Sequence, residues 1–268
     1  MDKIVKQIKR DHMKHLFLVT AIIASTAITA CGQQTAKPED TEVWAPVPTV
    51  VTPAKVVGEA PSDAIVLFNG ANLDEWVLTN DSTASNKWNL ANQVITVDKK
   101  AGDLQTKRKF TDFQLHIEYR IPQDIVGSGQ ARGNSGIFLA ALPWGAGGYE
   151  LQVLDNYKNA TYVNGQAGSF YKQSPPLVNA CRMPGEWNYY DVVWTAPRFN
   201  DDGSLKTPAR ATVLHNGVLV QNNTVLKGDT PYIGQPQYHK HGAAPIKLQA
   251  HGDDSKPISY RNIWVRPL

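Results

Sequence analysis

Residues 213–219 read Val-Leu-His-Asn-Gly-Val-Leu, and this stretch is the clearest single indication of the fold. Apolar residues precede and follow the pair Asn216-Gly217. A type I′ turn needs positive φ at both central residues, and an Asn-Gly pair meets that need at little cost. The stretch therefore predicts a β-hairpin with strands over 209–215 and 218–226.

The same kind of sequence, short β-branched and aromatic runs separated by Gly, Pro, Asn and Asp, extends from residue 64 to the C-terminus. This punctuation is typical of many strands joined by tight turns, and no segment shows a convincing helical period. So many strands without helices predict an all-β fold, a two-sheet antiparallel β-sandwich of the jelly-roll kind. Besides the hairpin, strands are predicted near 64–68, 87–90, 93–97, 112–121, 135–141, 149–155, 167–171, 187–196, 246–251 and 258–266.

The first thirty residues differ in composition from everything that follows. Five basic residues lie near the start, and residues 16–30 form an uncharged run of small and apolar side chains that is too short to span a bilayer. The run ends at Ala30-Cys31-Gly32, which matches the lipobox of bacterial lipoproteins. We therefore predict a lipoprotein signal peptide over 1–30 and lipidation of Cys31, the alternative being a plain signal peptide with an incidental cysteine.

The lipid on Cys31 is then the expected contact with a membrane, and Gly32 after it favours sorting to the outer membrane. The predicted location is the cell envelope, facing the periplasm or the exterior. Residues 31–60 contain four spaced prolines and no amphipathic period, which is typical of an extended tether. The folded domain is expected over 61–268.

Charge argues against a nucleic-acid partner. The chain has 27 Lys and Arg against 24 Asp and Glu, and the predicted signal peptide holds five of the basic and two of the acidic residues, which leaves 22 of each. The remaining chain is neutral and lacks a dense basic block. Once Cys31 is lipidated only Cys181 remains, so no intramolecular disulfide is expected and Cys181 is interpreted as a structural thiol.

Two of the predicted strands carry polar side chains of an unusual kind. Successive side chains of a strand face opposite ways, so Glu150 and Gln152 share one face while Leu151 points to the other. Gln249 and His251 share a face in the same way. A merely solvated face would be richer in Lys, Thr, Ser and Glu, which is the alternative interpretation for any one strand. Amides and titratable groups near aromatic residues are instead typical of a sugar-binding site.

Short motifs along the whole domain resemble those of the 3-keto-disaccharide hydrolase domain family, formerly a domain of unknown function. Singly they are weak, but their order and spacing together are specific. They are Leu67-Phe68-Asn69-Gly70, Asp112-Phe113-Gln114-Leu115, Gly133-Asn134-Ser135-Gly136-Ile137, Tyr149-Glu150-Leu151-Gln152-Val153-Leu154-Asp155, Gly185-Glu186-Trp187-Asn188, His215-Asn216-Gly217, Leu248-Gln249-Ala250-His251-Gly252 and Tyr260-Arg261-Asn262-Ile263-Trp264.

The resemblance implies a concanavalin-like lectin/glucanase sandwich and a specific chemistry. A 3-ketone acidifies the hydrogen on C2, so a base removes it, the enolate expels the glycosidic oxygen from C1, and water adds to the enone. The implied substrate is a 3-keto disaccharide or 3-keto glycoside. Two departures from the family are Ala250, where many relatives have an acidic residue, and residues 196–208, an expected hairpin loop on a rim.

On this basis the candidate catalytic residues are Glu150 and His251. Histidine suits proton transfer because its pKa lies near neutrality, although a buried structural histidine is the alternative. Arg261 would offset enolate charge, unless it forms a structural ion pair. Trp76 and Tyr171 are candidate aromatic platforms. The residues predicted to bind substrate are Asn134, Gln152, Asp155, Tyr171, Gln249 and Arg261.

No cofactor is required by this chemistry, and no metal site is predicted. His239 and His241 resemble a metal pair, but they lie in a stretch of loop composition without acidic or Cys partners. A structural calcium ion is compatible with the fold class, yet no motif assigns its ligands. The alternative function is a non-catalytic carbohydrate-binding module on the cell surface, which the fold also allows. A conventional β-glucanase is disfavoured because no strand shows two Glu flanking an Asp.

Overall fold

The structure is a computed structural model that describes residues 36–84, 88–143 and 147–268. The chain divides into two units, Met1–Thr49 and Val50–Leu268. In the first unit the described residues are exposed and include one short 3-10 helix, Pro38–Thr41. The second unit begins at Val50, ahead of residue 61 where composition placed the start of the domain. The predicted signal peptide and Cys31 lie outside the described residues.

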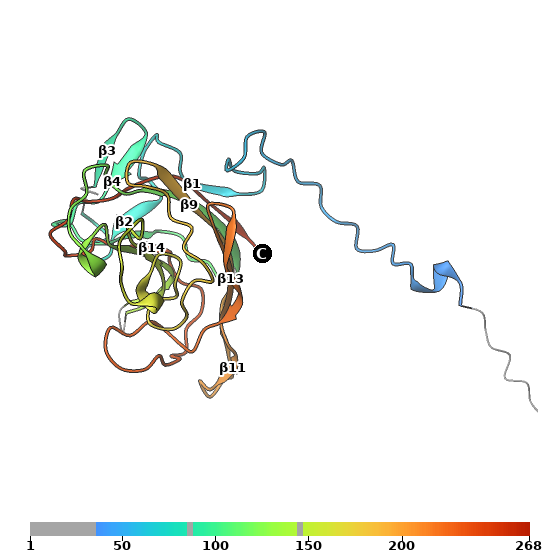
Figure 1. Ribbon diagram of the computed structural model, residues 1–268. Helices are drawn as coiled ribbons and strands as arrows, with labels where there is room; N and C mark the ends of the chain where they lie inside the picture. Colours follow the sequence, from blue (N-terminus) through green and yellow to red (C-terminus); the bar gives the residue numbers. More distant parts are fainter. Residues whose placement is uncertain (1–35, 85–87, 144–146) are drawn as a thin grey trace, which may run out of the picture. The chain divides into compact units, whose positions relative to one another are not determined.

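Two antiparallel sheets form the second unit, and Figure 1 shows them as layers, the larger marked by β9 and β13 and the smaller by β2 and β14. The larger sheet is built from β1 (Ile65–Phe68), β3 (Asn89–Ala91), β4 (Val94–Thr96), β6 (Phe113–Arg120), β9 (Trp187–Thr195), β12 (Arg210–His215), β13 (Val218–Val225) and β15 (Ser259–Pro267). The smaller sheet has the order β2 (Trp76–Leu78), β5 (Leu104–Thr106), β14 (Lys247–Leu248), β7 (Ser135–Ala141) and β8 (Gly148–Val153). The two-sheet β-sandwich predicted from the sequence is confirmed.

The remaining elements are small. β10 (Arg198–Phe199) and β11 (Leu205–Thr207) pair with each other, within the segment predicted as a hairpin loop. Two further 3-10 turns span Gly129–Ala131 and Val163–Gly165, and the described residues include no α-helix. At the hairpin quoted first, Asn216 and Gly217 have φ of 54° and 79°, so this turn has the backbone conformation predicted from the Asn-Gly pair.

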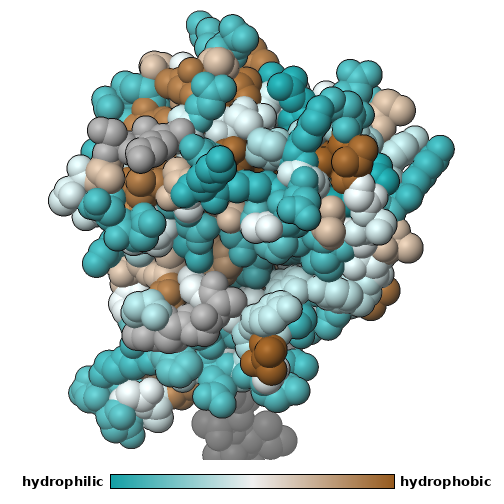
Figure 2. Space-filling model, turned by 90° about the vertical axis from the view of Figure 1, so that its left-hand side faces the viewer, coloured by the Kyte–Doolittle hydropathy of each residue, from teal (hydrophilic) through white to brown (hydrophobic). Residues whose placement is uncertain are grey.

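The core lies between the sheets and follows from the alternation of side chains along each strand. On β6 the side chains of Leu115, Ile117 and Tyr119 are fully buried, and they face Ile137 and Leu151 of the smaller sheet within one hydrophobic cluster. Each such aliphatic side chain contributes about 1.5–3 kcal/mol when it is buried. The face in Figure 2 is mostly hydrophilic, with hydrophobic residues scattered over it, as expected when the strands place their apolar side chains inward.

Three local expectations differ from the structure. Residues 167–171 do not form a strand, although Phe170 makes isolated bridges to Leu151 and Ser174 beside β8. The strands β2 and β5, of three residues each, were not expected from the sequence. Trp76 begins β2 and is 2% exposed, with its indole N–H donated to the carbonyl of Leu67 at 2.9 Å. Trp76 is therefore a core residue and not a sugar platform.

Candidate functional site

A cavity of about 250 Å³ lies on the outer face of the smaller sheet. Its lining residues are Asn134, Glu150, Gln152, Tyr171, Tyr232, Gln249 and His251. Six of these were singled out from the sequence. Glu150 and Gln152 lie on β8, Asn134 immediately precedes β7, Gln249 and His251 follow β14, and Tyr171 lies in the loop after β8. Their proposed roles stay predictions, since a shared cavity establishes proximity and not chemistry.

Strand register explains the convergence. Phe138 of β7 pairs with Glu150 of β8, and Gly136 pairs with Gln152. On the other side of β7, the N–H of Gln249 donates to the carbonyl of Gly136 at 2.9 Å, which extends the pairing beyond β14. A side chain on Gly136 would place its Cβ 2.5 Å from Oε1 of Glu150. The glycine therefore leaves the space that the Glu150 carboxyl group occupies.

The carboxyl group of Glu150 is nearly inaccessible to bulk water, since the residue is 4% exposed. Burial raises its pKa to about 8, against an ordinary value of 4.5, while the nearby Lys247 opposes this shift and Asp103 adds to it. Lys247 is held by Asp103, with Nζ 3.2 Å from the carboxylate. At neutral pH Glu150 is thus mostly a neutral acid that can donate a proton.

His251 is oriented by a carboxylate two residues further on. Its Nδ1 lies 2.8 Å from Oδ2 of Asp253, and its Nε2 lies 3.4 Å from Nδ2 of Asn134. Burial acts to raise the pKa of Asp253, but hydrogen bonds from Ser255, His251 and Lys99 outweigh it and lower that pKa. An ionised Asp253 favours the tautomer with the proton on Nδ1, which leaves Nε2 as an acceptor.

Amides form the floor of the cavity. Nε2 of Gln152 donates to Oδ1 of Asn134 at 3.0 Å, and Nδ2 of Asn134 donates to the carbonyl of Gln130 at 2.8 Å. Among the described residues, Oε1 of Gln152 and Oε1 of Gln249 are buried without a hydrogen-bond partner. Buried acceptors normally have partners, so these two oxygens are suited to bind ligand hydroxyl groups.

Two tyrosines form the rim. The Tyr171 hydroxyl lies 2.5 Å from that of Tyr162, and burial together with this hydrogen bond raises the pKa of Tyr171. Tyr232 is 69% exposed, and Nζ of Lys172 lies 4.7 Å from the centre of its ring. Tyr171 thus lines the cavity, and its role as an aromatic platform stays a prediction.

Sequence reasoning missed Tyr232, Asp253 and Lys247. Tyr232 lies in a loop with no periodic pattern, so nothing in the sequence ties it to the sheet. Asp253 had one usable signal, the spacing His-Gly-Asp at the end of a predicted strand, because Gly favours a turn that brings the two side chains together. Lys247 lies two residues before Gln249. Because residues two apart in a strand share a face, alternation would have predicted Lys247 on the face of Gln249.

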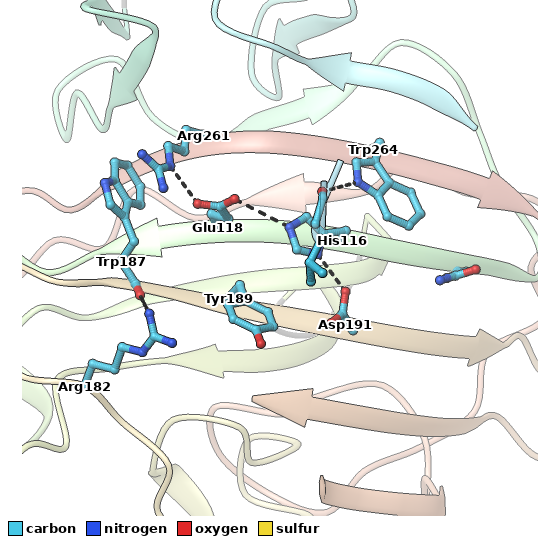
Figure 3. A pocket seen from close by; sticks show the side chains of 11 residues that line it. His116, Glu118, Arg182, Trp187, Tyr189, Asp191, Arg261 and Trp264 are labelled. Atoms are coloured by element: carbon cyan, nitrogen blue, oxygen red, sulfur yellow. Dashed lines mark hydrogen bonds and ion pairs between the residues drawn. The ribbon is translucent and has the colours of Figure 1, made fainter. Parts of the chain in front are cut away.

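Two predicted binding residues lie away from the cavity. Asp155 is 1% exposed and forms an ion pair with Arg132, whose Nε is 2.7 Å from Oδ2. Arg261 lies on the outer face of the larger sheet, where its Nε is 2.6 Å from Oε2 of Glu118 and its guanidinium stacks 4.1 Å from the Trp187 ring centre (Figure 3). The prediction that Arg261 binds substrate together with these residues was wrong, because Arg261 lies on β15, which belongs to the other sheet.

The His239 and His241 side chains have separate partners. Nε2 of His241 lies 3.1 Å from the Tyr149 hydroxyl, and Nδ1 of His239 lies 3.5 Å from Oδ2 of Asp229. Within the described ranges, no group of three or more His, Cys, Asp or Glu side chains is arranged to hold a metal ion. No helix in the described part of the chain has the length and apolarity to span a membrane.

The sandwich and the polar cavity on its outer face define a class, the carbohydrate-active β-sandwich proteins, and comparisons agree with it. The model of the 3-keto-alpha-glucoside-1,2-lyase-like domain family matches residues 63–266, so the chain belongs to this family. A candidate glycosyl hydrolase of Parabacteroides distasonis ATCC 8503 is 54% identical, with 88% of this chain and 99% of that chain covered and a TM-score of 0.81. The chain is thus a carbohydrate-active enzyme with a carbohydrate ligand.

More distant structures agree in fold alone. Two further candidate glycosyl hydrolases of Parabacteroides distasonis ATCC 8503 are 22% and 18% identical, with TM-scores of 0.55 and 0.53. Each comparison covers 76% of this chain, together with 99% and 94% of the other chain. The comparison with curated proteins gave no match.

Proposed function

We propose that this chain cleaves the glycosidic bond of 3-keto disaccharides or 3-keto glycosides by removing the proton next to the ketone. The observation that supports this most directly is the pairing, in one cavity, of a neutral buried Glu150 with a His251 that Asp253 orients. Conventional glycoside hydrolysis needs two carboxyl groups across the scissile bond. Among the described residues that line this cavity, Glu150 alone carries a carboxyl group.

In the proposed reaction Nε2 of His251 takes the proton from C2. The C1–O bond then breaks as the C1=C2 bond forms, and the leaving oxygen takes the proton of the Glu150 carboxyl group. Water adds across the resulting enone, with its hydroxyl on C1 and its proton on C2, and proton transfer from His251 to Glu150 restores both residues. The free oxygens of Gln152 and Gln249 would accept hydrogen bonds from sugar hydroxyls during these steps.

The test is turnover of a 3-keto disaccharide and of its unoxidised parent. We expect Glu150→Gln and His251→Ala each to lower turnover by about 10²-fold or more, the usual contribution of general acid–base catalysis, with the fold intact. The parent sugar should be a far poorer substrate because its C2 hydrogen is not acidic. Glu186→Gln and His239→Ala are matched controls, since neither residue lines the cavity.

Full activity in both cavity variants would contradict this mechanism. Sugar binding without turnover in the unaltered protein would instead support the non-catalytic binding module. Equal turnover of oxidised and unoxidised sugars would show that the ketone has no part in the reaction.

We also propose that the enzyme is a lipoprotein of the cell envelope, anchored through Cys31. The support is the sequence pattern of the first 32 residues, which includes the cysteine and its small neighbours. Cys31→Ser should release the protein from membranes or block its processing, as measured by fractionation and by the mass of the N-terminal peptide. Unchanged membrane retention together with normal cleavage would contradict lipidation.

A further inference from the structure

A second and larger cavity, of about 470 Å³, lies on the outer face of the eight-stranded sheet, the opposite side of the sandwich from the Glu150 cavity. Most of its side chains come from three adjacent strands, β6, β9 and β15 (Figure 3), and Val57, Gly58 and Arg182 line it from outside the strands. Its charged and aromatic lining residues include His116, Glu118, Arg182, Tyr189, Asp191 and Trp264. The function proposed above uses none of them.

The charges in this cavity compensate one another. Nδ1 of His116 lies 2.6 Å from Asp191, and its Nε2 lies 3.7 Å from Glu118. Glu118 is also paired with Arg261 at 2.6 Å. Each carboxylate therefore has a basic partner, and the cavity presents hydrogen-bond donors and acceptors without a large excess of either charge. Such a lining suits an uncharged polyhydroxyl ligand better than a polyanion.

A sheet face that only contacts solvent does not need such a network of ion pairs. His116 is 2% exposed and the Glu118 side chain is 16% exposed, so both are partly removed from water. Buried ion pairs rarely stabilise a fold more than well-packed apolar groups would, because desolvation offsets their attraction. A binding role accounts for their presence more directly than stability does.

Aromatic rings complete the site. His116 lies between Trp264, at 5.5 Å between ring centres, and Tyr189, at 5.7 Å. Trp187 has the guanidinium groups of Arg261 and Arg120 against its ring, at 4.1 and 4.6 Å. Tyr189 has one more distant guanidinium over its ring, that of Arg182 at 5.9 Å, and Arg182 is itself held by the Trp187 carbonyl at 2.9 Å. Tyr189 is thus less covered than Trp187 and is the better placed ring for stacking on a sugar.

The cavity continues beyond the segment around Gly58. An adjacent cavity of about 550 Å³ shares Val57, Glu118, Arg261 and Trp264 with the first and extends to Gln93 beside β4. Between the two, the Gly58 carbonyl accepts hydrogen bonds from Trp264 and Asn262 at 2.9 and 2.8 Å. Together the two cavities form a groove that crosses several strands and exceeds the size of one sugar ring.

We propose that this groove is a second carbohydrate-binding site, which holds an uncharged oligosaccharide on the face of the sandwich opposite the Glu150 cavity. It does not depend on the reaction proposed above. A site of this kind would retain a glycan chain while the other cavity acts on a small oxidised sugar.

The test uses the mature protein with Glu150→Gln and Gln152→Ala, so that the first cavity is impaired. Binding of maltohexaose, isomaltohexaose, laminarihexaose and cellohexaose is measured by calorimetry, with a hexamer of galacturonate as the charged comparison. We expect saturable binding of at least one uncharged hexasaccharide and weaker binding of the galacturonate. Tyr189→Ala and Arg182→Ala should each weaken that binding about tenfold, the scale of losing one aromatic or bidentate contact.

Val193→Ala is the matched control, because Val193 lies two residues from Asp191 on the same face of β9, is 45% exposed and lines neither cavity of the groove. Thermal unfolding of each variant establishes that the fold is retained. The proposal is overturned if no uncharged hexasaccharide binds, if the galacturonate binds more tightly, or if Tyr189→Ala and Arg182→Ala bind as well as Val193→Ala.

Discussion

Glu150 differs from an ordinary surface glutamate because its ionised form is disfavoured by burial. Its pKa is 4.5 in an unfolded chain and about 8 in the fold, so the folded state holds a proton that the unfolded state releases between these values. The contribution of this group to the free energy of unfolding is therefore fully present below pH 4.5 and is lost as the pH rises through about 8. A neutral acid at pH 7 is also what protonation of a leaving oxygen requires.

Glu150→Gln should remove this dependence on pH. Between pH 5 and 9 the unaltered protein should lose more stability than the variant, by at most about 5 kcal/mol, since each unit of pKa corresponds to about 1.4 kcal/mol. Chemical denaturation at several pH values measures the difference, with Glu186→Gln as the control. Parallel stability curves for Glu150→Gln and the unaltered protein would show that the carboxyl group is not buried as described.

At this scale, alternation was enough to predict which side chains share a face. Glu150 and Gln152 had to lie opposite Leu151, and the structure places them so. Arg261 shows the limit of such reasoning, because alternation gives the face of a strand but not which of the two sheets the strand joins. The pKa of Glu150 was equally beyond prediction, since it depends on how completely neighbouring segments cover the carboxyl group.

At the scale of elements, β7 and β8 fit together because one position has no side chain. The strands pair so that Gly136 lies beneath the Glu150 carboxyl group, where a Cβ would be 2.5 Å from Oε1 and 3.0 Å from Cδ. The glycine is needed for space and not for a special backbone conformation, as its φ is not positive.

Gly136→Ala should therefore displace the Glu150 side chain. We expect a loss of stability of about 1–3 kcal/mol, typical of overpacking, together with a marked loss of turnover of a 3-keto disaccharide. Gly242→Ala is the control, because a Cβ there meets no atom within 4 Å. Denaturant unfolding and turnover are the measurements, and a Gly136→Ala protein that matches the control in both would contradict the packing described here.

The ends of long strands were predicted more closely than those of short strands. Long strands such as β6 and β9 were predicted within two residues of their ends, because eight or nine residues display a clear alternation. Short strands varied: β2 and β5 were not predicted, whereas β3, β4 and β14 overlap the strands predicted near 87–90, 93–97 and 246–251. The segment 167–171 has strand composition, but it makes only isolated bridges beside β8.

At the scale of the whole molecule, the sandwich carries polar cavities on both outer faces, and each depends on segments outside the regular strands. The Glu150 cavity takes Tyr232 from a loop, and the opposite groove is crossed by the residues around Gly58. These residues precede β1 and lie in the stretch that composition assigned to the tether. Composition could not reveal their contacts, because a proline-rich segment carries no periodic signal when it packs through its backbone.

This arrangement predicts different stabilities for a chain that begins at Val50 and one that begins at Pro61. The shorter chain loses the Gly58 carbonyl, which accepts hydrogen bonds from Trp264 and Asn262, and it loses the Thr52 backbone, which bonds to Ser62 at 3.0 Å. Water replaces part of these bonds, so we expect a cost of about 1–3 kcal/mol.

Both chains should remain all-β, because the sheets and the core are complete from β1 onward. The cost corresponds to a melting temperature lower by a few degrees, at about 2–4 °C per kcal/mol for a domain of this size. Thermal unfolding followed by circular dichroism measures the shift and the strand content together. Equal melting temperatures would mean that residues 50–60 act only as tether, and a spectrum dominated by helix would contradict the sandwich itself.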